Sequence, residues 1–248
     1  MTSPVLHYIY DPLCGWCWGA APLVRAARAV LPVRLHAGGM MAGAQRQPVT
    51  PELRAFVLIH DQRIAEATGQ PFGDAYRDGL LCDPQAVFDS EPPTAAILAA
   101  EALAGRGADM LAELQAAHYV QGRRIAEPAV LIEQAVAIGL PRAEFATELG
   151  RQSLGPVQAH IEQTRSFMAQ TGARGFPSFV LETSAGFCSV DASVYLGRPQ
   201  DFAAALQGLD DGLRVRGRCC NHPEDLAGCR LLLERFGKVS IASLELVE

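Results

Sequence analysis

The stretch YDPLCGWCWG, residues 10–19, carries two cysteines separated by two residues. At the start of a helix, the first sulfur of such a pair meets unsatisfied backbone N–H groups and the positive end of the helix dipole, which stabilise a thiolate. Cys14 would then be the exposed nucleophile. Cys17, one turn further into the helix, would attack a mixed disulfide formed on Cys14. The spacing therefore predicts thiol–disulfide exchange.

Two other interpretations of the cysteine pair stay open. A zinc site of this kind usually needs a second Cys-x-x-Cys or a Cys/His pair, and no such pair flanks Cys14 nearby. The cysteines could also be buried and inert, although structural cysteines have no reason to pair at a strand-to-helix junction. Redox chemistry is favoured over both.

The stretch ARGFPSFVLE, residues 173–182, is the second motif that bears on chemistry. A proline just ahead of a strand is a place for a cis bond, here Phe176–Pro177, because X-Pro bonds adopt cis at low cost. A cis-proline loop facing the cysteines would block metal binding and present backbone groups to an extended substrate. An ordinary trans proline entering an edge strand is the alternative.

Five side chains are candidates for substrate binding around the cysteines. Trp16, Trp18 and Phe176 supply aromatic surface that either shapes a peptide-accepting groove or packs the start of the helix. Asp11 could tune Cys14 or accept a proton, although a turn-forming role before proline also accounts for it. His60 lies on a predicted apolar stripe, where it either packs in the core or lines the groove.

The segments around the cysteines follow the pattern of a β-α-β unit. Val5–Tyr10 and Val33–Ala37 are short and rich in β-branched or aromatic residues, and the Ala-rich segment 19–31 between them predicts a helix. The cysteine pair falls where the first strand passes into that helix.

The residues from about 50 to 152 predict a helical insertion without strands. Thr50-Pro51 is a good helix start, and an apolar stripe follows it, made of Leu53, Phe56, Val57, His60, Ile64 and Ala67. Further helices are predicted over 93–104, 109–122, 128–139, 142–150, 156–171 and 199–206, with strands over 177–182 and 186–190. Gly172 is placed to cap the helix that precedes it.

The predicted order is β-α-β, a helical block, then α-β-β-α, which defines an α/β domain over residues 1–208. Residues 209–248 form a C-terminal extension of unknown role. We predict that Cys82 and Cys188 are passive. Four soft ligands in the extension predict zinc binding, a second disulfide or unpaired thiols: Cys219, Cys220, His222 and Cys229.

Composition narrows the class of protein. The chain has 248 residues, of which 49% are hydrophobic and 19% charged, as expected for a globular core. Its net charge of −6 argues against nucleic-acid binding, and no apolar run is long enough to span a membrane. The N-terminus lacks the pattern of a secretory signal, so we expect a cytoplasmic protein, where a persistent cysteine pair is catalytic or metal-bound.

Together the two motifs resemble the thioredoxin fold, and the helical insertion makes the chain similar to the DsbA-like family. The segments SEPPTAAILAAEAL and LQAAHYVQGRRIAEPAVLIEQAVAIGL resemble its cytoplasmic FrnE-type branch. The likeness covers about residues 4–208. It implies a protein-disulfide oxidoreductase or isomerase with Cys14 as nucleophile, Cys17 as resolving thiol and Pro177 as the cis-proline of the substrate groove.

The chain departs from the family pattern at two places. Gly-Trp lies between the cysteines instead of the Pro-His of the best-known oxidants, so their redox potential does not transfer. Phe176 precedes the proline where smaller residues are frequent, which would narrow the groove.

We expect protein or low-molecular-weight thiols and disulfides as substrates, no bound redox cofactor, and glutathione as a candidate co-substrate. Kappa-class glutathione transferases and 2-hydroxychromene-2-carboxylate isomerases resemble this architecture but place a serine at the nucleophile position, so they are the second hypothesis. A peptide-binding, chaperone-like protein is the third.

Overall fold

A mixed four-stranded sheet organises the computed structural model, which describes residues 3–208. The strand order is β2-β1-β5-β6. Strand β1 (Val5–Tyr10) runs parallel to β2 (Val33–Ala37) and antiparallel to β5 (Ser178–Thr183), which pairs with β6 (Gly186–Val190). All four predicted strands are therefore present in the predicted chain order.

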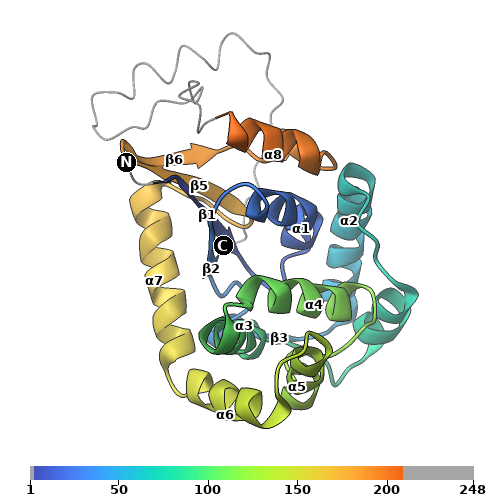
Figure 1. Ribbon diagram of the computed structural model, residues 1–248. Helices are drawn as coiled ribbons and strands as arrows, with labels where there is room; N and C mark the ends of the chain where they lie inside the picture. The colour runs from blue at the N-terminus through green and yellow to red at the C-terminus, as the bar shows by residue number, and fades with distance from the viewer. Residues whose placement is uncertain (1–2, 209–248) are drawn as a thin grey trace.

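Helices cover both faces of this sheet (Figure 1). Helix α7 (Pro156–Thr171) lies on one side, and α1 (Gly15–Arg28) and α8 (Pro199–Gln207) lie on the other. Phe179 of β5 contacts Phe202 of α8 with ring centroids 5.5 Å apart. The predicted α/β arrangement is confirmed.

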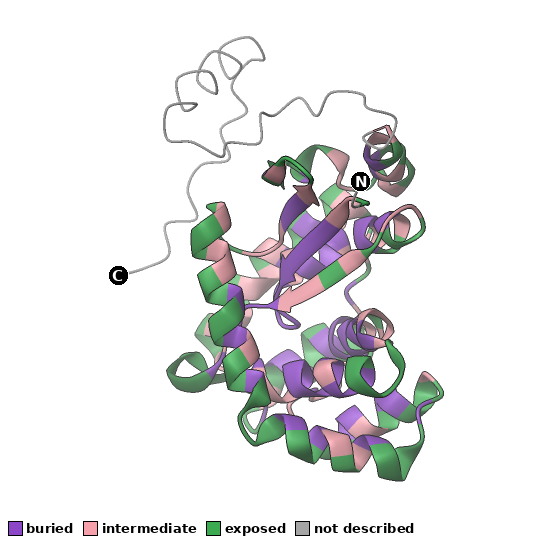
Figure 2. Cartoon of the chain, turned by 60° about the vertical axis from the view of Figure 1, so that its left-hand side comes forward, coloured by how far each residue is buried: buried purple, intermediate pink, exposed green. Residues whose placement is uncertain are grey.

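The central strand β1 is the most deeply buried element, as Figure 2 shows for the middle of the sheet. Tyr8 stacks on Tyr10 of the same strand at 5.3 Å and on Phe179 at 4.9 Å. Burying these large rings supplies several kilocalories per mole of apolar stabilisation. The end of β1, from which the chain turns into Cys14, is thereby fixed in the core.

The helical insertion is confirmed: α2 lies beside α1, and α3 to α6 lie below the sheet in the view of Figure 1. Thr50 caps the first by accepting a hydrogen bond from the Leu53 amide, and Gly69 ends it in the left-handed conformation, at φ 72°. The helices are α2 (Pro51–Thr68), α3 (Glu91–Ala104), α4 (Gly107–Tyr119), α5 (Pro128–Ala137) and α6 (Arg142–Ser153).

The sequence analysis does not predict two short strands, one just before the insertion and one within it. Strand β3 (Gln47–Pro48) pairs antiparallel with β4 (Val87–Phe88). Two-residue strands are too short to show a period of alternation. Short turns of 3₁₀ or π-helix complete the irregular segments: η1 (Gly43–Gln45), η2 (Ala75–Gly79), η3 (Leu80–Cys82) and η4 (Ser193–Tyr195).

The predicted apolar stripe of α2 is confirmed only in part. Leu53, Val57 and Ile64 pack against the core. Phe56, by contrast, is 57% exposed, and Asp61 is buried instead. The helix turns this face inward because Ile64 packs on the glycine surface of α1, at Gly15 and Gly19. Local apolar periodicity contains no information about that partner.

Helix α1 begins at Gly15, four residues before the predicted start, so the second cysteine lies within it. Within residues 3–208, no helix has both the length and the apolar character needed to cross a membrane. The C-terminal extension, with Cys219, Cys220, His222 and Cys229, lies outside the described residues.

Candidate active site around Cys14 and Cys17

Cys14 occupies the N-cap position of α1, with extended backbone angles of φ −87° and ψ 114°. Its carbonyl oxygen accepts hydrogen bonds from the amides of Cys17 at 2.9 Å and Trp18 at 3.1 Å, which close the first helical turn. The cysteine pair therefore lies at the predicted strand-to-helix junction. There the helix dipole and the free amides of the first turn favour negative charge on the Cys14 sulfur.

Cys17 lies behind Cys14 and has no exposed surface, whereas Cys14 is 6% exposed. Burial raises the pKa of the Cys17 thiol, and the neighbouring Cys14 acts in the same direction. The Tyr8 hydroxyl donates to the Cys17 carbonyl oxygen at 3.3 Å and so ties this turn to β1. This order of burial fits the predicted roles of nucleophile and resolving thiol.

The two sequence motifs meet at the Cys14 sulfur. The Phe176–Pro177 peptide bond is cis, as predicted. The Cys14 thiol donates a hydrogen bond to the Phe176 carbonyl oxygen, with 3.5 Å between sulfur and oxygen, across 162 residues of sequence. The backbone of the cis-proline loop therefore lies directly beside the candidate nucleophile.

A third loop, which follows β2, borders the same site. A Cβ atom at Gly38 would lie only 2.2 Å from Cζ of Phe176, so the ring occupies the space that the glycine leaves. Arg165 of α7 donates to the carbonyl oxygens of Gly38 at 3.1 Å and Gly39 at 2.9 Å. The sequence analysis does not identify these residues, although a Gly-Gly pair directly after a strand marks a close backbone approach.

Asp11 is completely buried and holds the turn into the cysteine motif. One carboxylate oxygen accepts hydrogen bonds from the Leu13 amide and the Ser90 hydroxyl, both at 2.9 Å, and the other accepts from the Met40 amide at 2.6 Å. Burial raises the pKa of Asp11, while these bonds and the charge of Arg165 oppose the rise. The placement argues against the predicted substrate contact and supports the turn-forming role.

The remaining predicted binding residues separate into packed and partly exposed side chains. Trp18 is 7% exposed, donates its indole N–H to the Pro71 carbonyl at 2.9 Å and stacks on Tyr119, which argues against substrate contact. Trp16 is half-buried at the start of α1 and stays a candidate. His60 is half-buried with its ring 4.5 Å from the exposed Phe56, and its predicted role stays untested.

A second buried acid near the motif was not expected from the sequence. Asp61 of α2 is 5% exposed and accepts a hydrogen bond from the Tyr76 hydroxyl at 3.1 Å. Its other carboxylate oxygen lies 3.2 Å from the position of a Cβ atom on Gly15, the first residue of α1. Burial raises the pKa of Asp61 to about 7, while the Tyr76 hydrogen bond and the Arg77 charge oppose the rise.

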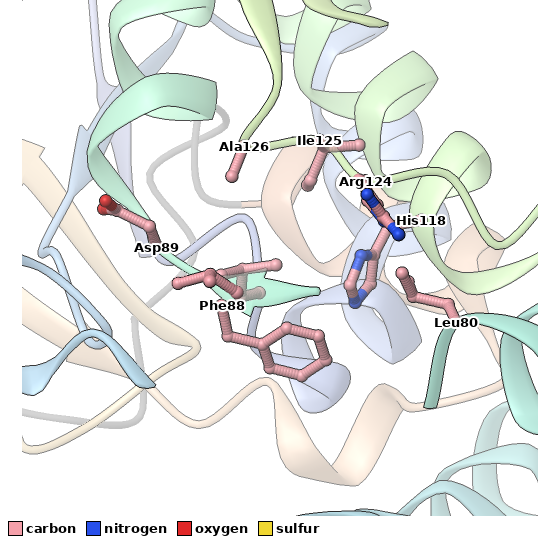
Figure 3. Close-up of a pocket in the computed structure, with 9 residues that line it drawn as sticks. Leu80, Phe88, Asp89, His118, Arg124, Ile125 and Ala126 are labelled. Atoms are coloured by element: carbon pink, nitrogen blue, oxygen red, sulfur yellow. The ribbon is translucent and has the colours of Figure 1, made fainter. Parts of the chain in front are cut away.

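A small cavity of about 10 Å³ lies under the turn, lined by Leu13 and by residues of the insertion (Figure 3). The His118 ring lies between Leu80 and Phe88 there, and burial lowers the pKa of His118 to about 3. The cavity has room for about one water molecule, so it is too small for a disulfide substrate. Substrates must approach Cys14 from its exposed side.

Comparisons with known proteins agree with this geometry. A model of the DSBA-like thioredoxin domain matches residues 5–198. A comparison with curated proteins found no match.

Several solved structures resemble this chain over most of its length. The cytosolic disulfide reductase DsbM from Pseudomonas aeruginosa matches with a TM-score of 0.79 and 54% identity, covering 83% of this chain and 98% of that one. The structure of DsbM with GSH matches with a TM-score of 0.77, 53% identity and the same coverage. A candidate protein disulfide isomerase from Nitrosomonas europaea matches with a TM-score of 0.68 and 27% identity, covering 84% and 97%.

The predicted thioredoxin fold and the predicted oxidoreductase activity are thereby confirmed, while the likeness to the FrnE-type branch stays a prediction. The chain is a thiol–disulfide oxidoreductase and belongs to the family of DSBA-like thioredoxin domains.

Proposed function

We propose that the chain reduces disulfides of proteins or small thiols through Cys14 as nucleophile and Cys17 as resolving thiol. The observation that carries this proposal is the position of the Cys14 sulfur, at the N-cap of α1 and 3.5 Å from the carbonyl oxygen beside the cis-proline. The helix favours the thiolate, and the backbone of the cis-proline loop beside Cys14 would contact an extended substrate.

The proposed reaction has two exchange steps. The Cys14 thiolate attacks one sulfur of the substrate disulfide, forms a mixed disulfide and releases the other half as a thiolate. Cys17 then loses its proton and attacks the Cys14 sulfur, which releases the second half of the substrate. The cysteines lose two electrons and the substrate gains two, so the cycle needs no bound redox cofactor.

Glutathione is the reductant that we propose for the return step. Two glutathione molecules would reduce the Cys14–Cys17 disulfide by the same two exchanges and leave as glutathione disulfide. The support is a relative of 53% identity whose structure was solved with GSH. Since a 54% identical relative is a cytosolic reductase, we place this reaction in the cytoplasm and regard reduction as its main direction.

Cysteine variants test the proposed roles. With a glutathionylated peptide as substrate, Cys14→Ser should lower the turnover rate by about a thousandfold or more, because Cys17, the other thiol in the first turn of α1, has no exposed surface. Cys17→Ser should retain the first exchange and accumulate a mixed disulfide on Cys14, detected by intact mass and peptide mapping.

The exposed Cys82 provides the matched control. Cys82→Ser should turn over like the unmodified chain. Substantial turnover by Cys14→Ser, or an adduct of Cys17→Ser that maps to a cysteine other than Cys14, would overturn the proposed roles.

A further inference from the structure

Strand β2 lies at one edge of the sheet, and its outer side faces no other strand within residues 3–208. At the two ends of its pairing with β1, the Leu6 amide donates to the Pro32 carbonyl oxygen and the Gly38 amide to the Tyr10 carbonyl oxygen, both at 2.9 Å. Backbone groups alternate in direction along a strand. Every second residue of β2 therefore turns its N–H and C=O groups away from β1.

The residues that turn these groups outward are Val33, Leu35 and Ala37. The Ala37 amide donates to Nε2 of His160 in α7 at 3.0 Å, so this end of the edge is satisfied within the chain. For the outward groups of Val33 and Leu35, the described part of the chain supplies no such partner. Free groups of this kind are the template on which an extended peptide can add a strand.

A hollow of about 620 Å³ lies along this edge and is lined by residues of β2, α3 and α7. Figure 1 shows β2 at the border of the sheet, with α7 beside it and α3 below. The volume is within the range of natural ligand sites. A second folded copy of the chain would bring its own helices against these walls, whereas an extended segment needs only the width of one strand, about 5 Å.

One face of β2 offers apolar surface to this hollow. Val33 and Leu35 share that face, since side chains alternate along a strand, and both are half-buried. Ile97 and Leu98 of α3 add to the apolar lining. Apolar side chains of an added strand would be covered there.

The other face of β2 carries Arg34 and His36. The His36 ring stacks on Phe167 of α7 with ring centroids 4.8 Å apart. The Arg34 side chain is 65% exposed, and its ion pair with Glu182 is long, at 3.9 Å, while the same carboxylate oxygen lies 2.9 Å from Nε2 of His7. The charge of Arg34 is therefore available to a carboxylate on this face.

Two other charged side chains of the hollow are engaged by closer partners. Arg28 pairs with Asp109 at 2.8 Å, and Glu101 accepts a hydrogen bond from the Gly107 amide at 2.9 Å. Arg34 thus sets the charge preference along the β2 edge.

We propose that this hollow binds an extended peptide segment, which adds to β2 as a fifth strand of the sheet. Its apolar side chains lie beside Val33 and Leu35, and an acidic side chain lies beside Arg34. The segment therefore alternates apolar and acidic residues. The inference does not depend on the redox reaction, because no cysteine within residues 3–208 lines the hollow.

The test is the fluorescence anisotropy of a labelled pentapeptide, Val-Glu-Val-Glu-Val with blocked ends, titrated with the full chain. The probe contains no cysteine, so its binding cannot arise from disulfide exchange. We expect saturable binding. A peptide of the same composition in the order Val-Val-Val-Glu-Glu should bind about fivefold more weakly or less, because it lacks the alternation. Equal binding of the two peptides would overturn the proposal.

Methylation of the probe's backbone amides separates strand addition from binding through side chains alone. A strand turns every second amide towards its neighbour. N-methylation of that set should lower the affinity by about tenfold or more, and N-methylation of the other set by about twofold or less. Equal losses from the two sets would contradict a fifth strand, and this comparison needs no variant of the protein.

Variants of β2 locate the site. Leu35→Pro removes an outward amide without removing a bond to β1, and it should lower the affinity by about fivefold or more. Arg34→Gln should lower the affinity by about twofold to fivefold. The matched control is Arg25→Gln, which removes the same charge from the exposed surface of α1 outside the hollow and should bind the probe like the unmodified chain. Near-ultraviolet circular dichroism checks that each variant is folded.

Two other occupants give different results. If a second copy of the chain covers β2, analytical ultracentrifugation shows a dimer that the probe dissociates. If the probe occupies the substrate groove, a photo-crosslinking version labels the loop at Phe176 and Pro177 instead of β2. Either result, or the absence of probe binding, would overturn the proposal. None of these measurements depends on Cys14, so the proposed function can fail while this inference holds.

Discussion

Two buried carboxyl groups near the start of α1, Asp11 and Asp61, have different surroundings. Asp11 is satisfied by two backbone amides and the Ser90 hydroxyl, so its charge is used to fix the turn after β1. Asp61 accepts a hydrogen bond from the Tyr76 hydroxyl and lies next to Gly15, the first residue of α1. At the scale of the residue, three hydrogen bonds offset the burial of the Asp11 carboxylate, whereas burial raises the pKa of Asp61 to about 7.

His118 makes the stability of the fold depend on pH. Its pKa is about 3 in the folded chain and about 6.5 in the unfolded chain, so between these values the unfolded state binds the extra proton. The contribution of His118 is therefore fully present above about pH 6.5 and is lost as the pH falls. At pH 5 the loss is about 2 kcal/mol.

Urea unfolding of the unmodified chain and of His118→Phe, at pH 7 and pH 5, measures this contribution. The variant cannot titrate at this position, and its ring replaces the imidazole among Tyr76, Phe88 and Tyr119. Comparing two chains cancels the opposite contributions of the buried acids. The loss of stability from pH 7 to pH 5 should be about 2 kcal/mol smaller in His118→Phe. An equal loss in both chains would contradict the buried, neutral imidazole.

At the scale of elements, three loops contact one another at the start of helix α1. The turn after β1 carries Cys14, the loop after β2 carries Gly38, and the loop before β5 carries the cis-proline. Arg165 of α7 fixes the second loop through two carbonyl oxygens. Regular strands and helices thus set the positions of three irregular segments that contact one another.

Gly38→Ala tests whether the loop after β2 sets the position of Phe176. Gly38 is not in the left-handed backbone region, so the obstacle to alanine is space: the new Cβ would meet the Phe176 ring at 2.2 Å. The Phe176 ring must then move, and we expect the movement to shift the Phe176 carbonyl oxygen beside Cys14. We expect the unfolding free energy to fall by about 1 to 2 kcal/mol. We also expect the substitution to slow exchange with a peptide disulfide more than it slows reaction with a small alkylating reagent.

A double-mutant cycle with Phe176→Ala is the control for this prediction. Once the ring is absent, Gly38→Ala should cost about 0.5 kcal/mol or less, because the clash has been removed. Equal costs in the two backgrounds would show that the alanine acts by some other route than the Phe176 ring.

Elements with local signals could be predicted from the sequence, and those that depend on a distant partner could not. The Thr50-Pro51 start and the Gly172 end of their helices are set by neighbouring residues, and both are present, with Gly172 at φ 68°. The inward face of α2 depends on the glycines of α1, and the burial of Asp61 depends on Tyr76. The Cys14 and Pro177 motifs were recognisable because each is local, whereas the contact of Gly38 with Phe176 joins residues far apart.

At the scale of the whole molecule, the sheet domain and the helical insertion build the site together. The sheet positions the cysteine turn and the cis-proline loop, while the insertion contributes Ser90, which bonds Asp11, and Asp61 beside Gly15. Trp18 and Tyr119 join the two parts by stacking across α1 and α4. The insertion therefore helps to hold the turn that carries the cysteine pair.

The redox equilibrium of Cys14 and Cys17 across glutathione buffers tests this account most directly. We would measure it by tryptophan fluorescence and intact mass in a chain whose other five cysteines, Cys82, Cys188, Cys219, Cys220 and Cys229, are replaced by serine. The account predicts one two-electron transition, with a midpoint nearer to that of thioredoxin, about −270 mV, than to that of DsbA, about −120 mV. A chain that forms no internal disulfide, or one with a midpoint near about −120 mV, would contradict it.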